Sequence, residues 1–217
     1  PNANYTGAAL DAIWGLDDGF KQATALIEVG LLDYDETRNR YNQLPLLRAY
    51  ALKLLTDANE HEAVFGRYAD FYTQRAVQIF IDTPIQHWGD KEGGANFDDV
   101  VNIKALGSEL MRQTQNGTIG DLKRAYEFAL ATTYYVNSRM EEKAWDWLLM
   151  GISAVRQSPK DATNEVFLKK HLAVFLNDMG GVYSALGELQ KALTYFEQAL
   201  SMIREVGDGD GEADTLH

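Results

Sequence analysis

The fold of this chain is decided by residues 176–199, LNDMGGVYSALGELQKALTYFEQA. Small residues recur where two antiparallel helices would approach each other, and large residues fill the space beside them. The small residues are Gly180, Ala192 and Ala199, and the large ones are Leu176, Tyr183 and Phe196. Gly187 falls between the two periodic segments and supplies a turn. The stretch therefore predicts a tightly packed pair of helices.

This spacing resembles the tetratricopeptide repeat, in which such helix pairs stack into a superhelix. A weaker copy of the pattern occurs upstream. It consists of Phe128, Ala131-Thr132, Tyr135, Ala144, Leu148 and Gly151. The two copies predict an α-helical, tetratricopeptide-like superhelix over residues 121–217.

Residues 1–57 predict a different local order. A helix over 17–29 ends at Gly30, and short strands over 31–34 and 40–44 flank a polar turn. Pro45 then suits the first position of another helix. Six apolar residues should give that helix a buried stripe: Leu46, Leu47, Tyr50, Ala51, Leu54 and Leu55. Helix, β-hairpin and helix in this order are typical of part of a winged-helix domain.

Residues 58–120 predict a helical linker domain. One helix should bury Ala69, Tyr72, Ala76 and Ile79. Residues 82–96 should form a loop rich in glycine, and Asn96 should cap the next helix. That helix should bury Phe97, Val100, Ile103, Leu106 and Leu110. The predicted fold class is therefore mainly α, with three domains over residues 1–57, 58–120 and 121–217.

Two segments resemble the bacterial signal-transduction ATPases with numerous domains, which are NB-ARC-type (STAND NTPase) regulators. Residues 41–51, YNQLPLLRAYA, resemble the end of their winged helix, and residues 98–110, DDVVNIKALGSEL, resemble the helix that follows. Tetratricopeptide repeats come next in that family as well. Leu44 stands where the family has a histidine that contacts nucleotide phosphate. Because the chain also lacks a loop ending in Gly-Lys-Ser/Thr, we expect no nucleotide site here and an ATPase domain upstream.

Composition excludes several classes of protein. With no cysteine, the chain has no disulfide scaffold and no cysteine-ligated metal. Its net charge of −12 argues against nucleic acid as the main partner, because binding to phosphates needs basic patches. No apolar run approaches the roughly 18 residues of a membrane span. We therefore expect a cytoplasmic protein.

No catalytic, cofactor-binding or metal-binding residues are predicted. Asp208, Asp210, Glu212 and Asp214 alternate as in a calcium loop, but Ala213 stands where such a loop needs glycine, so we expect an inter-repeat loop. Aromatic residues are dense at Tyr134, Tyr135, Trp145 and Trp147. They either pack between helices, which the spacing favours, or line a binding groove.

The predicted ligand groove follows from the resemblance to tetratricopeptide repeats, where the first helix of each pair faces the concave side. It comprises Asn177, Gly181, Ser184 and Ala185, although a solvated face explains these small and polar residues equally well. The regulator resemblance implies a non-catalytic sensor segment. It would bind a protein, peptide or small ligand and relay this through the winged helix to an upstream ATPase domain.

The alternative function is a free-standing tetratricopeptide adaptor for protein–protein interaction. An all-helical enzyme is a third reading, but no motif supports it. The C-terminal helices should also present an apolar stripe that favours self-association, formed by Leu193, Phe196, Leu200 and Ile203.

Overall fold

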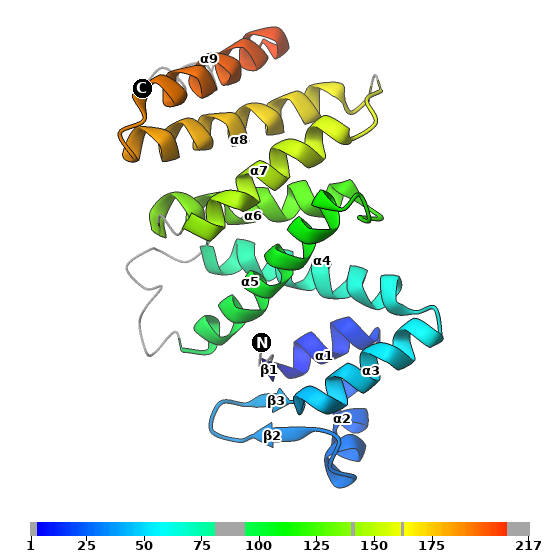
Figure 1. Cartoon of the computed structure of the whole chain (residues 1–217). Helices are drawn as coiled ribbons and strands as arrows, with labels where there is room; N and C mark the ends of the chain where they lie inside the picture. The colour runs from blue at the N-terminus through cyan, green and yellow to red at the C-terminus, as the bar shows by residue number, and fades with distance from the viewer. Residues whose placement is uncertain (1–3, 81–93, 140–141, 162, 208–217) are drawn as a thin grey trace. The chain divides into compact units, whose positions relative to one another are not determined.

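The computed structural model describes residues 4–80, 94–139, 142–161 and 163–207. Within these ranges the chain is mainly helical, with nine helices and one small three-stranded sheet (Figure 1). It divides into two compact units, residues 1–106 and 107–217. The mainly α prediction is confirmed, and the division into three domains stays a prediction.

The first unit begins with strand β1 (Asn4–Tyr5) and helix α1 (Gly7–Trp14). The backbone N–H of Ala9 donates to the Thr6 hydroxyl at 3.1 Å, which caps the helix. Helix α2 (Gly19–Glu28) follows, and Gly30 adopts a φ of 72° just after it. The predicted helix stop at Gly30 is thus confirmed, because glycine reaches this left-handed conformation without a steric penalty.

The predicted hairpin is present as β2 (Asp33–Asp35) and β3 (Arg40–Asn42), which pair antiparallel. Strand β1 pairs with the other edge of β3, so the sheet order is β1-β3-β2. The sequence did not predict β1, because two residues are too few to show an alternating pattern. Tyr41 lies opposite both Tyr5 and Tyr34, and it is buried in the core of the unit.

Helix α3 (Pro45–Asp57) begins at the predicted proline, but its predicted buried stripe is wrong. None of its residues is buried. Leu46 is 81% exposed and Tyr50 is 61% exposed, while Leu47, Ala51 and Leu55 are half-buried. Apolar spacing predicted the helix and its inner face, but the neighbouring helices do not close over that face.

Helix α4 (His61–Phe80) buries the four residues predicted for its inner face: Ala69, Tyr72, Ala76 and Ile79. Helix α5 (Gly94–Gln115) begins at Gly94, so the predicted loop ends earlier than residue 96 and Asn96 is not the cap. Residues 82–93 of that loop lie outside the described ranges. The buried positions predicted for this helix are confirmed at Val100, Ile103, Leu106 and Leu110, whereas the side chain of Phe97 lies outside the description.

The second unit contains helices α6 (Leu122–Arg139), α7 (Glu142–Gln157), α8 (Glu165–Ala185) and α9 (Leu189–Val206). Helix α6 packs against α7, α7 against α8, and α8 against α9 (Figure 1). Gly187 has a φ of 76°, as its predicted place in the turn between α8 and α9 requires.

The weaker upstream pattern also forms a packed helix pair. Its buried positions are Phe128, Ala131, Thr132, Tyr135, Leu148 and Gly151, while the side chain of Ala144 lies outside the description. A Cβ at Gly151 would lie 2.8 Å from Cβ of Ala129 and 2.8 Å from the Phe175 ring. This glycine therefore permits close contact of α7 with both α6 and α8. Among the described helices, none is both long and apolar enough to cross a bilayer.

Candidate functional site

The four residues predicted to line a ligand groove lie on one exposed stripe of α8. Gly181, Ser184 and Ala185 are exposed, and Asn177 is half-buried. Their spacing of three, four and eight residues places them on one side of a helix. A Cβ at Gly181 would meet no described atom within 4 Å apart from its own turn of helix, so the backbone is open to an approaching molecule there.

Helix α6 lies beside this stripe and adds polar and aromatic groups to it. The Asn137 amide donates to the Asp178 carboxylate at 2.9 Å. Nearer the start of both helices, the rings of Tyr126 and His171 lie 6.0 Å apart. These two contacts occur in the same order along the two helices, so α6 and α8 run parallel. Tyr134 of α6 is 47% exposed, and Val174 of α8 is 44% exposed.

We call this surface the α6–α8 face. It is defined by Tyr134 and Asn137 of α6 together with Val174, Asn177, Asp178, Gly181, Ser184 and Ala185 of α8. It combines an open backbone position, two amides, two hydroxyls, one carboxylate and one exposed aromatic ring. Such a mixture suits hydrogen bonding to an extended polar ligand more than burial of an apolar one.

Two acceptor groups on the α6–α8 face are poorly solvated. Burial raises the pKa of Asp178 to about 6, although the hydrogen bond from Asn137 partly opposes the shift. The Oδ1 atom of Asn177 is buried and has no hydrogen-bond partner among the described residues. Removing such groups from water without full compensation is costly. A ligand that donates a hydrogen bond to the half-buried Asp178 carboxylate would reduce that cost, whereas Asn177 Oδ1 has no surface open to a ligand.

Some aromatic residues of α6 and α7 pack between the helices, and others are exposed or half-buried. The Trp147 ring lies 5.2 Å from the Phe128 ring and 6.2 Å from the Tyr135 ring, and all three side chains are buried. Packing between helices, the favoured prediction, is confirmed for Tyr135 and Trp147. Tyr134 is 47% exposed and lies three residues before Asn137, so it shares that side of α6, while Trp145 is half-buried.

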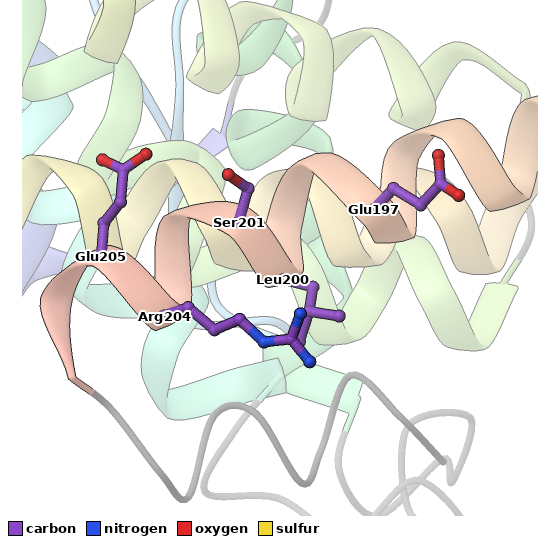
Figure 2. A pocket seen from close by; sticks show the side chains of 5 residues that line it. All are labelled: Glu197, Leu200, Ser201, Arg204 and Glu205. Carbon is purple, nitrogen blue, oxygen red and sulfur yellow. The ribbon is translucent and has the colours of Figure 1, made fainter.

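A second candidate is a depression on the outer surface of α9. Figure 2 shows the five residues that line it, which are Glu197, Leu200, Ser201, Arg204 and Glu205. All five belong to one helix, so no second element among the described residues frames a ligand there. Glu205 also forms an ion pair with Lys169 of α8 at 3.1 Å. This depression is therefore a charged helix surface, and we assign no ligand or reaction to it.

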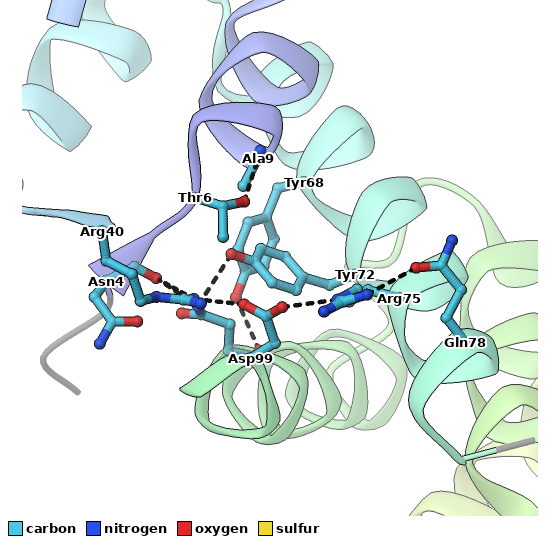
Figure 3. Close-up of polar contacts among 10 residues, drawn as sticks. Asn4, Thr6, Ala9, Arg40, Tyr68, Tyr72, Arg75, Gln78 and Asp99 are labelled. Carbon is cyan, nitrogen blue, oxygen red and sulfur yellow. Dashed lines mark hydrogen bonds and ion pairs between the residues drawn. The ribbon is translucent and has the colours of Figure 1, made fainter. Parts of the chain in front are cut away.

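A buried polar cluster in the first unit is a third candidate (Figure 3). The Arg40 guanidinium donates to the Asp99 carboxylate, and Arg75 donates to the other oxygen of Asp99 at 2.7 Å. The Asn102 amide donates to the Tyr72 hydroxyl at 3.0 Å and to the carbonyl of Asn4 at 2.8 Å. These bonds link β1, β3, α4 and the first part of α5. The cluster thus has a structural role.

The described residues contain no group of three or more histidine, aspartate or glutamate side chains placed to hold a metal ion. The calcium-like run from Asp208 to Asp214 lies outside the described ranges.

Sequence reasoning missed Asn137 and Asp178. Asp178 falls one residue after the predicted Asn177, but nothing local indicates that α6 supplies its partner 41 residues earlier. Only the packing of α6 on α8 brings these two side chains together.

In comparisons with known proteins, no family model, curated protein or solved structure matches this chain.

Proposed function

We propose that this chain is a non-catalytic sensor segment that binds a protein or peptide on the α6–α8 face. The carrying observation is that two parallel helices together present an open backbone position and an under-solvated carboxylate on one surface. The Gly181 backbone is uncovered, and the half-buried Asp178 carboxylate lies one turn before it on the same helix. A peptide supplies backbone N–H donors, which this carboxylate can accept.

The wider assignment is the regulatory region of a signal-transduction ATPase of the NB-ARC type. The order α2, β2, β3, α3 in the first unit is consistent with the winged-helix resemblance. The helix pairs α6–α7 and α8–α9 support tetratricopeptide-like stacking in the second unit. In this proposal, occupation of the repeats is relayed through the winged helix to the ATPase domain.

Peptide selection with a matched pair of variants tests the binding face. Random displayed peptides are selected on the immobilised chain, and the affinity of enriched peptides is measured by fluorescence anisotropy. Gly181→Trp should weaken binding at least tenfold, because the indole covers the open backbone position without entering the core. Thr194→Trp, at an exposed position of α9, should leave affinity unchanged.

Two results would contradict the binding proposal: failure to enrich any peptide, or equal loss of affinity in both variants.

The reading frame of the parent gene tests the link to an ATPase. The regulator predicts a Gly-Lys-Ser/Thr loop encoded about 200–300 residues upstream, a span of roughly two domains. Its absence would favour the free-standing adaptor, which keeps the same binding face.

A further inference from the structure

A cavity of about 700 Å³ lies in the first unit along helix α3. Helices α1, α2, α3 and α4 all contribute to its walls, together with Tyr5 at the end of β1 and Gln43 just after β3. Because four helices surround it, the cavity is a concave pocket and not the face of a single helix. Its volume falls within the roughly 300–1,000 Å³ that is typical of small-molecule sites.

The inner and outer walls of this cavity differ in how tightly they are packed. Leu10, Ile13 and Leu32 form part of the inner wall and belong to the buried core. The outer wall is α3, which contributes Leu47, Ala51 and Leu55, all half-buried, and which has no buried residue. Helix α3 therefore covers the core without closing onto it, and the space between them is the cavity.

The lining of the cavity is rich in aromatic and aliphatic side chains. Trp14, Phe65 and Tyr68 contribute rings. The Tyr68 hydroxyl donates a hydrogen bond to the backbone carbonyl of Asn102 at 3.0 Å. Among the described residues that line the cavity there is no lysine or arginine; Glu60, which is exposed, and His61, which is half-buried, also line it. A charged ligand would lose its hydration there without gaining a buried counter-charge.

We propose that this cavity binds one uncharged, mainly apolar organic molecule of one or two rings. The aromatic walls offer stacking and edge contacts to such rings. The bound molecule transfers its apolar surface from water to the leucine-rich lining. A partner helix fits less well, because a helix with its side chains is about 10 Å wide and needs an open trough along its length.

Titration of the full chain with the neutral fluorophore N-phenyl-1-naphthylamine tests the proposal. We expect saturable binding at one equivalent, with a micromolar dissociation constant and blue-shifted emission. Ala51→Trp places an indole inside the cavity and should weaken binding at least tenfold. Ala49→Trp makes the same substitution at an exposed position of the same helix and should leave binding unchanged.

A second measurement keeps the test independent of how well the Ala51→Trp variant folds. Nuclear Overhauser contacts in the unsubstituted chain should connect the naphthyl protons to the methyl groups of Leu47, Leu55 and Val64. Their absence, or binding that both tryptophan variants weaken equally, would overturn the proposal. So would dimerisation that Ala51→Trp breaks and Ala49→Trp leaves intact, because a second copy would then be the occupant of the cavity.

The cavity proposal stands apart from the peptide-binding proposal. Gly181→Trp lies in the other unit and should leave fluorophore binding unchanged, so the failure of either proposal can be recognised separately.

Discussion

The Phe196 ring occupies the space that a side chain at Gly180 would need. A Cβ built on Gly180 would lie 2.5 Å from Cε1 and 2.6 Å from Cδ1 of that ring. The ring of α9 therefore rests directly on the backbone of α8. Close approach at this glycine, predicted from the spacing of small and large residues, is confirmed.

Gly180→Ala should lower the free energy of unfolding by roughly 1–2 kcal/mol. Overpacking against the Phe196 ring costs about 1–3 kcal/mol, and the higher helix propensity of alanine offsets up to about 1 kcal/mol of that. The neighbouring Gly181→Ala is the control. Its Cβ meets no atom within 4 Å, so it should stabilise the chain by about 0.5–1 kcal/mol. Urea denaturation measures both, and equal stability of the two variants would contradict the packing argument.

Asp178 should make the chain less stable as the pH rises from about 4 to about 7. Burial raises its pKa from 3.8 to about 6, so the folded state holds this proton more tightly than the unfolded state does. The stabilising contribution is complete below the unfolded pKa and is lost as pH rises through the folded pKa. Asp178→Asn should thus match the parent chain near pH 4 and exceed its stability near pH 7.5. The expected gain is roughly 1–3 kcal/mol, since one pKa unit corresponds to about 1.4 kcal/mol.

Asp161 provides a control of opposite sign for this pH series. Hydrogen bonds from the Thr163 hydroxyl and from the backbone of Thr163 and Asn164 lower its pKa. Its contribution is therefore present at neutral pH and is lost as pH falls through the folded pKa. Asp161→Asn should reduce stability near pH 7 and have little effect at the lowest pH. The same slope in both variants would mean that Asp178 is not the titrating group.

Asp99→Asn should destabilise the first unit by about 3–5 kcal/mol, because it leaves the Arg40 guanidinium buried without its counter-charge. Arg40 is 1% exposed in its side chain, whereas the side chain of Arg75 is 26% exposed. Arg75→Gln should therefore cost less, on the order of 1 kcal/mol. Thermal and urea unfolding compare the two. A cost for Arg75→Gln equal to that of Asp99→Asn would show that burial does not determine the ranking.

Self-association should depend on the apolar residues that α9 exposes. Of the four residues predicted for its exposed stripe, Ile203 is buried and Phe196 and Leu200 are half-buried, but Leu193 is 50% exposed. Leu189 is 66% exposed at the start of the helix. Leu189→Glu combined with Leu193→Glu should weaken any dimer about tenfold or more, because each buried leucine contributes about 1.5–3 kcal/mol.

Sedimentation equilibrium measures this change in dimerisation. Thr194→Glu adds a charge to the same helix at an exposed position without removing an apolar group, so it should leave the dimer constant nearly unchanged. A parent chain that stays monomeric at high concentration would contradict the prediction.

The sequence by itself determined the features that depend on neighbours along the chain. Helices α8 and α9, the turn at Gly187 and the stop at Gly30 follow from periodicity and from the backbone freedom of glycine. The stripe of α8 that carries Asn177, Gly181 and Ser184 follows in the same way, because spacing decides which residues share a face of a helix.

Tertiary structure alone decided what lies against each face. The apolar spacing of α3 predicted burial, yet the cavity leaves that face half-buried. Arg40 meets Asp99 across 59 residues, and Asn137 meets Asp178 across 41 residues. Periodicity specifies the direction in which a side chain points along its own helix. It contains no information about which distant element packs there, because that choice depends on the shape and burial of the whole unit.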